Sequence, residues 1–398
     1  MKKRYDGYTA YGYLTARADY RVFDLPDGVD RVPSQQVEVT REQEARVDRL
    51  LDEHVVISLH DHPTFIPNDV SQIFDYRREG RDVTAYAELS RSRMDVVFDN
   101  LNDGSTLITS KNGWKWGDVL FDLGMRQADL AHQNYIVPVL RYDDILRCKR
   151  GGLLGMVFSL EAATMIENEL DRLDILYGFG VRSMGLVYSE SNSLGSGLKE
   201  ARDGGLTVLG RQVVRRMNQL GIAIDVSHAG DQTSLDIAEA SELPVFITHA
   251  GARRLWSSAR MKPDDVIRAV AERGGMMGIE AAPHTTLTTN HPRHSIDSVM
   301  EHFEYVAELV GMDHVGFGPD TLYGDHVGLH EAFSTQLGVA AIHRGLEFPK
   351  VEFVDGMENP TETFPNIVRW LVKHGYSDED IGKVIGGNAQ RILRQIWR

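Results

Sequence analysis

Cysteine is almost absent from this chain, since Cys148 is the only one among 398 residues. A single thiol excludes an internal disulfide and a zinc cluster built from cysteines. It also fits a reducing compartment. The basic start Met1–Arg4 has no apolar stretch behind it, so we expect a cytoplasmic protein without a signal peptide.

Basic residues are outnumbered as well. The 43 Lys and Arg face 58 Asp and Glu, which gives a formal net charge of −15. This balance argues against nucleic acid or an anionic membrane surface as a partner. No apolar run reaches the roughly 18–20 residues that span a bilayer, so we expect no membrane segment.

Nucleotide-binding glycine motifs are missing too. No Gly-x-Gly-x-x-Gly follows the first apolar run and no Walker A loop occurs, which disfavours a nucleotide-binding fold. Instead, short apolar runs alternate with helical patterns. The runs are Val55–Leu59, Met94–Phe98, Leu153–Leu160, Val181–Val187, Ile222–Ser227, Pro244–Thr248, Gly274–Ile279 and His314–Gly318. The clearest helical patterns are Arg41–Glu53, Trp116–Gln133, Leu206–Leu220, Thr233–Ser241, Pro263–Arg273 and Ile296–Val310.

Continuous apolar runs are typical of parallel strands buried on both faces. Eight strand–helix units predict an α/β protein with a TIM (β/α)8 barrel rather than a doubly wound sheet. We expect residues 1–45 to form an N-terminal arm that packs on the barrel, and residues 46–398 to form a single barrel domain. Residues 64–93 and 321–360 are long connections, which tend to carry function in compact domains.

Residue types that bind metals directly follow five of the eight runs. They are His60 and His62 after the first run, and Glu161, His228, His249 and Asp320 after later ones. The active site of a TIM barrel lies at the carboxyl ends of its strands, so these side chains are expected at one rim. Each has an ordinary structural explanation alone, but five strand ends together predict a metal site. Imidazoles and carboxylates suit Zn²⁺ and related divalent ions.

The number of histidines favours two ions. An ordinary catalytic zinc takes about three protein ligands plus water, and four histidines exceed that. Two divalent ions bridged by one carboxylate fit the set better. Such a pair holds a bridging hydroxide as nucleophile and polarises a carbonyl. A nearby carboxylate is then needed to shuttle the proton.

Several longer motifs carry a family resemblance. They are Gly205–Thr207 through Met217–Gly221, Ile224–His228, Thr248–Arg253, Pro263–Asp265, and Gly375–Ser377 through Gly386–Arg391. In these stretches the sequence resembles the membrane (renal) dipeptidase family, peptidase M19, of the amidohydrolase superfamily. The resemblance runs from about residue 50 to the C-terminus. It implies a hydrolase with a binuclear zinc site, and a homodimer.

The resemblance also implies roles for the residues at the strand ends. His60 would bind the first ion, Glu161 would bridge both ions, and His228 with His249 would hold the second. Asp320 matches the acid–base aspartate of the family.

Two further residues are candidates for substrate binding. Arg260 matches the family's arginine for the terminal carboxylate of the substrate, which a guanidinium recognises well. Arg253 and Arg254 are close competitors for this role. Glu280, at the end of the seventh run, is a candidate substrate contact, with a helix-capping or supporting role as the alternative.

The chain departs from the family at two positions. His62 stands where the family motif His-x-Asp has its aspartate, so a charged ligand becomes neutral and bound water should ionise more readily. Asp61 is the alternative ligand, although adjacent residues of a strand face opposite ways. Tyr188 stands where the family has a histidine, and its phenol can donate a hydrogen bond to a developing oxyanion.

These observations predict amide hydrolysis of a small, carboxylate-bearing substrate, with weak activity on ordinary L,L-dipeptides. The alternatives are a lactone or ester hydrolase, a one-metal lyase or isomerase, and a pseudoenzyme barrel, which the complete ligand set argues against. The remaining candidates are expected to be a loop cysteine and solvated loop histidines, with a position at the site entrance as the alternative for the histidines. They are Cys148, His284, His291, His294, His326 and His330.

Overall fold

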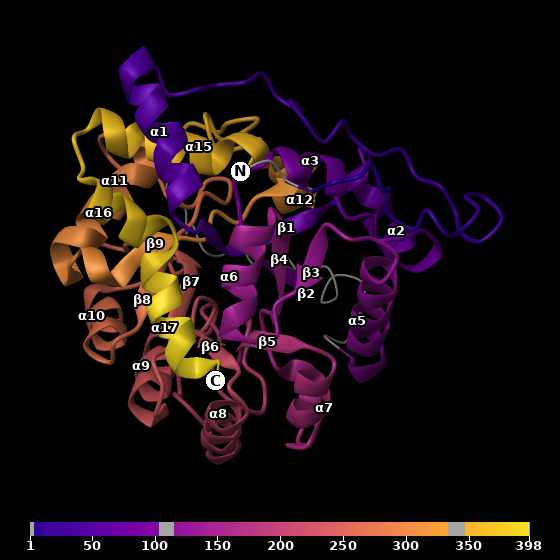
Figure 1. Cartoon of the computed structure of the whole chain (residues 1–398). Helices are drawn as coiled ribbons and strands as arrows, with labels where there is room; N and C mark the ends of the chain where they lie inside the picture. Colours follow the sequence, from indigo (N-terminus) through magenta and orange to yellow (C-terminus); the bar gives the residue numbers. More distant parts are fainter. Residues whose placement is uncertain (1–3, 103–114, 333–346, 398) are drawn as a thin grey trace.

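The computed structural model describes residues 4–102, 115–332 and 347–397 (Figure 1). Its strands are β1 (Ile57–Phe65), β2 (Val96–Asn102), β3 (Ile136–Pro138), β4 (Leu154–Leu160), β5 (Val181–Gly185), β6 (Ala223–Asp225), β7 (Phe246–Ala250), β8 (Met276–Ile279), β9 (Val315–Phe317) and β10 (Leu322–Tyr323). All pairings between them are parallel, in the order β10-β1-β2-β4-β5-β6-β7-β8-β9, with β3 beside β4.

The two edges of this sheet meet and close the barrel. The backbone N–H of Asp320 donates to the carbonyl of His60 at 2.9 Å, and that of His62 donates to the carbonyl of Thr321 at 2.8 Å. The predicted (β/α)8 barrel is confirmed, and each of the eight apolar runs overlaps one barrel strand. The short strands β3 and β10 were not predicted.

Helices surround the strands (Figure 1). They are α1 (Arg41–Glu53), α2 (Ile73–Glu79), α3 (Tyr86–Arg91), α5 (Trp116–Leu130), α6 (Tyr142–Gly151), α7 (Arg172–Gly178), α8 (Val208–Leu220), α9 (Asp231–Ala240), α10 (Asp264–Glu272), α11 (Ile296–Val310), α12 (His326–Ala332), α15 (Pro360–Lys373), α16 (Asp378–Gly382) and α17 (Asn388–Ile396). Local sequence signals determine where several of these helices begin or end. Thr40 and Gln43 form a capping box at the start of α1, and Gly221 ends α8 in the left-handed conformation.

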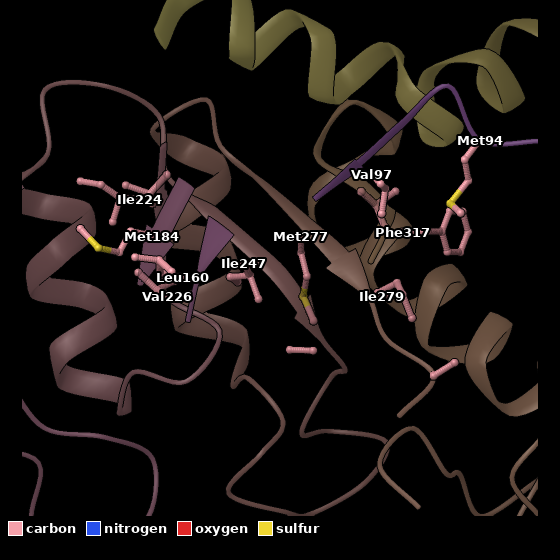
Figure 2. Packing of buried hydrophobic residues seen from close by; sticks show 14 of the residues in the cluster. Met94, Val97, Leu160, Met184, Ile224, Val226, Ile247, Met277, Ile279 and Phe317 are labelled. Carbon is pink, nitrogen blue, oxygen red and sulfur yellow. The ribbon is translucent and has the colours of Figure 1, made fainter. Parts of the chain in front are cut away.

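Apolar side chains fill the space between strands and helices. Figure 2 shows Leu160, Met184 and Ile247 among these buried residues. A second cluster closes the amino end of the barrel, where Ile392 and Ile396 of α17 pack with the first residues of several strands, among them Ile57 of β1. The carboxyl ends of the strands therefore lie on the side away from α17.

The N-terminal arm follows an extended path and meets α15. Arg31 pairs with Glu358, and Asn359 accepts a hydrogen bond from the N–H of Val32 and donates one to its carbonyl, at 3.4 and 3.0 Å. The N–H of Val37 donates to Asn366 at 3.1 Å. The division of the chain at residue 45 stays a prediction.

The connection 64–93 contains two helices, α2 and α3. In the connection 321–360, residues 333–346 lie outside the described residues. Cys148 was wrongly predicted to lie in a loop, because it is a buried residue of α6. Among the described residues, no helix has the length and apolarity that crossing a membrane requires.

Candidate metal centre

Six donor side chains converge at the carboxyl end of the barrel. His60 and His62 lie in β1 and His249 lies in β7, while Glu161, His228 and Asp320 closely follow β4, β6 and β9. In each of three groups, the ligand atoms lie within 4.8 Å of one another. The groups are His60, His62 and Glu161; His60, His249 and Asp320; and Glu161, His228 and His249.

One half of the cluster is centred on Glu161. Its Oε2 lies 2.9 Å from Nε2 of His228 and 4.0 Å from Nε2 of His249. The two imidazole Nε2 atoms are themselves 3.0 Å apart. Because Glu161 also belongs to the group with His60 and His62, it is the one carboxylate shared by the two halves of the cluster.

The other half is centred on Asp320. Its Oδ1 lies 3.3 Å from Nε2 of His60 and 3.0 Å from Nε2 of His62. These two nitrogens are 3.4 Å apart. The ring of His60 stacks on the ring of His249, with centroids 3.4 Å apart, so the two halves are in contact.

Asp61 does not face this cluster. Its carboxylate accepts hydrogen bonds from the hydroxyl of Ser58 and from N and Oγ1 of Thr321, the latter two at 2.8 and 2.7 Å. Burial raises the pKa of Asp61 to about 6. The alternation along β1 thus turns His62, and not Asp61, toward the other donors.

The imidazoles of the cluster are suited to bind a cation. Burial lowers the pKa of His60, and it lowers the pKa of His228 and His249 well below the usual value. These side chains are therefore neutral at neutral pH, which is the form that binds metals. Neutral nitrogens and carboxylates packed this closely match the donor chemistry of divalent ions such as zinc.

Arg260 and Glu280 form a buried ion pair beside the cluster. The exposed fractions are 5% for Arg260 and 0% for Glu280. Nη1 of Arg260 donates to the carbonyl of His249 at 3.1 Å, and Nη2 donates to Oε2 of Glu280. Burial raises the pKa of Glu280 to about 7. Of the competitors, Arg253 pairs with Asp231 through both Nη atoms and Arg254 is exposed.

Tyr188 covers one face of the cluster. Its ring stacks on the imidazole of His228, with centroids 4.1 Å apart and planes 22° apart. The aromatic ring of Tyr188 is therefore beside a candidate ligand.

Several buried polar residues near the cluster were missed or misjudged. Asn100 of β2 places its amide nitrogen 2.6 Å from Nδ1 of His60. His284 and His294 were wrongly predicted to be solvated, since both are buried and the N–H of His284 donates to Nδ1 of His294 at 2.9 Å. His291 is exposed, as predicted. No local signal marked these residues, because Asn100 follows Asp99, and His284 and His294 stand beside polar residues of the sequence.

His326 and His330 were wrongly predicted to be loop residues, since both lie in α12, where His326 is buried and His330 is half-buried. Their rings are 4.5 Å apart in an edge-to-face arrangement. Burial lowers the pKa of His326 well below the usual value and that of His330 to about 4. Both are neutral imidazoles, and Asp320 is among the charges that act on them.

A (β/α)8 barrel with buried imidazoles and carboxylates at the carboxyl ends of its strands has the architecture of metal-dependent barrel hydrolases. The model of the membrane dipeptidase family, peptidase family M19, matches residues 44–398, and the chain belongs to this family. The protein is therefore a hydrolase of a metallopeptidase family, which implies a divalent metal.

Individual relatives agree with this assignment. The dipeptidase tcpJ of Claviceps purpurea is 25% identical over 393 residues, which cover 94% of this chain and 81% of that protein. An amidohydrolase from Pseudomonas aeruginosa has a similar structure, with a TM-score of 0.71 and 24% identity over 88% of this chain and 99% of that one. The probable dipeptidase PvdM from Pseudomonas aeruginosa follows with a TM-score of 0.70 and 18% identity, covering 90% and 99%. These structures share the fold.

Proposed function

We propose that the protein is a binuclear metallohydrolase that cleaves an amide bond in a small molecule with a free carboxylate. The observation that carries this proposal is the sharing of Glu161 between a group with His60 and His62 and a group with His228 and His249. This is the arrangement expected of a carboxylate that bridges two ions. Zinc is the proposed metal, because the donors are imidazoles and carboxylates.

The proposed ions supply Lewis-acid activation of a water molecule and of the scissile carbonyl when they are bound. The residues of the chain transfer the proton and bind the carbonyl oxygen. Asp320 takes up the proton released from the attacking water and returns it to the leaving amine, since its carboxylate lies at the centre of the site. Tyr188 donates a hydrogen bond to the carbonyl oxygen.

Arg260 is the proposed contact for the substrate carboxylate. Its guanidinium is held in place by the carbonyl of His249 and by Glu280, which leaves further N–H groups available for a second carboxylate. Glu280 shares this guanidinium, so we propose that it tunes the affinity for the substrate.

The proposed substrates are amides of the dipeptide type, which the name of the relative tcpJ also suggests. Tyr188 is neutral and cannot act as a cationic imidazole would. We therefore propose that ordinary L,L-dipeptides are poor substrates and that other carboxylate-bearing amides are better.

Metal analysis and a substrate panel test the proposal together. We expect two divalent ions per chain, and turnover of dipeptides with other stereochemistry or of N-acyl amino acids. Lactones serve as the comparison within the same assay. One ion at full loading, or lactone turnover above that of every amide, would contradict the proposal.

The role of Tyr188 has its own test. Tyr188→Phe should lower kcat more than it changes KM, because a hydrogen bond to the oxyanion forms only in the transition state. The matched control is Tyr305→Phe, which removes a phenol of α11 that donates to Asp264 at 2.8 Å. Efficient hydrolysis of plain L,L-dipeptides that Tyr188→Phe leaves unchanged would show that Tyr188 has no such role.

A further inference from the structure

A carboxylate and a hydroxyl lie behind His249, on the side away from the other donors. Oγ1 of Thr248 is 2.8 Å from Nδ1 of His249, and it lies 2.7 Å from Oδ2 of Asp225. Asp225 is the last residue of β6 and Thr248 is in β7. Both side chains are buried, so water does not compete for these hydrogen bonds.

The hydrogen bonds fix where the protons are. Asp225 accepts from N and Oγ of Ser227, at 3.0 and 2.6 Å, and from N and Oγ1 of Thr248, at 2.9 and 2.7 Å. A carboxylate only accepts, so the single proton of the Thr248 hydroxyl points to Asp225. Oγ1 of Thr248 then has only lone pairs to offer to His249.

The imidazole must therefore donate from Nδ1. With the proton on Nδ1, Nε2 of His249 carries its lone pair, and this is the atom that faces His228 at 3.0 Å and Glu161 at 4.0 Å. We propose that Asp225 and Thr248 are positioning residues that hold His249 in the tautomer able to bind metal through Nε2. This inference rests on the proposed metal site.

Thr248 is the necessary link in this chain of contacts. Oδ2 of Asp225 lies 4.0 Å from Nδ1 of His249, which is too long for a direct hydrogen bond. By contrast, Nδ1 of His228 is buried without a hydrogen-bond partner among the described residues. The restraint thus acts on one of the two histidines that face each other.

Substitutions at Thr248 separate this role from a merely structural one. Thr248→Val keeps the shape of the side chain and removes the hydroxyl, whereas Thr248→Ser keeps the hydroxyl. In a competition titration of the apoprotein with Zn²⁺ and a chromophoric chelator, Thr248→Val should bind one ion about 10–100-fold more weakly than the wild type. Thr248→Ser should stay close to the wild type.

The matched control is Thr233→Val. Thr233 is equally buried and its Oγ1 donates to Asp203 at 2.7 Å, in the same arrangement of threonine and carboxylate. This variant should lower the melting temperature of the apoprotein without changing zinc affinity. If Thr248→Val does not fold, Thr248→Ala makes the same comparison, since it also removes the hydroxyl.

The outcomes are distinct. Wild-type zinc affinity in the Thr248 variant that lacks the hydroxyl, or equally weak binding by Thr248→Ser, would overturn the role of Thr248 and leave the proposed function standing. A wild-type protein that binds no divalent ion would overturn both.

Discussion

Asp320 has an unusual backbone conformation, and its carboxylate lies close to two histidines. Its φ of 58° lies in the left-handed region, which costs a residue other than glycine about 1–3 kcal/mol. That conformation places its carboxylate at 3.3 and 3.0 Å from His60 and His62. Strain of this kind is retained at functional sites, and it supports the choice of Asp320 as the proton shuttle.

Asp320→Asn tests this choice. Asparagine tolerates the left-handed conformation, so the backbone should be unchanged. We expect kcat to fall about 10²–10⁴-fold, because an amide cannot shuttle a proton, while the metal content stays at the wild-type level. The control is Asp325→Asn, which changes a partly buried carboxylate of the same connection. Loss of metal from Asp320→Asn would make Asp320 a ligand, and nearly full turnover would remove its role in proton transfer.

Arg260→Ala should weaken substrate binding. A charge-assisted hydrogen bond is worth about 1.5–3 kcal/mol, so KM for a carboxylate-bearing amide should rise about 10–150-fold. The same amide with its carboxylate blocked should be affected much less by the substitution. Steady-state kinetics on the pair of substrates measure this. Equal losses for both substrates would show that Arg260 acts on the fold of the site instead.

Glu280 should make this binding depend on pH. Its pKa is raised to about 7 by burial, so below that pH the carboxyl is neutral and the charge of Arg260 is available to the substrate. Above it, ionised Glu280 competes with the substrate carboxylate, and KM should rise about fivefold, or ~1 kcal/mol. KM measured across this range should lose that dependence in Glu280→Gln. If KM still depends on pH in this variant, a group other than Glu280 causes the dependence.

Among the strands and helices, the sequence pattern predicts most of the barrel. Strands such as β4 and β7 are buried along their whole length, and such strands read as continuous apolar runs. Pairing across the fold is harder to predict. The contact between Arg260 and Glu280 spans 20 residues and depends on side-chain conformations that no local pattern specifies. For the same reason, the burial of His284 and His294 was missed.

Close strand packing gives the next prediction. A Cβ on Gly278 of β8 would lie 2.1 Å from the carbonyl oxygen of Thr248 in β7. Gly278→Ala must push the strands apart, so it should destabilise the protein by about 1–3 kcal/mol or more. Thermal unfolding measures this. The control is Gly124→Ala in α5, where the new Cβ would meet no described atom within 4 Å apart from its chain neighbours and the backbone of its own helix. This change should stabilise the helix by up to about 1 kcal/mol. Equal melting temperatures for the two variants would contradict the packing argument.

For the protein as a whole, the barrel topology explains why the site could be predicted before any side-chain contact was known. The carboxyl ends of all parallel strands lie at one rim of the barrel. Donors more than 250 residues apart, such as His60 and Asp320, were therefore expected to lie close together. The sequence could not show how tightly they pack. The structure places their ligand atoms within 4.8 Å of one another, together with His249. Polar groups buried this closely are stabilised by the cations that bind them.

Removal of metal should therefore destabilise the entire barrel. An ion present at about 1,000 times its Kd stabilises the native state by about 4 kcal/mol, which for a large domain corresponds to a loss of roughly 5–10 °C in Tm on chelation. Scanning calorimetry with and without a chelator measures the shift, and added Zn²⁺ should restore it. The double variant His228→Ala/His249→Ala should show a smaller shift in Tm on chelation, because it lacks two of the donors. Asp320→Asn should respond like the wild type. A wild-type Tm that is the same with chelator and with zinc would show that these donors hold no ion in the folded protein.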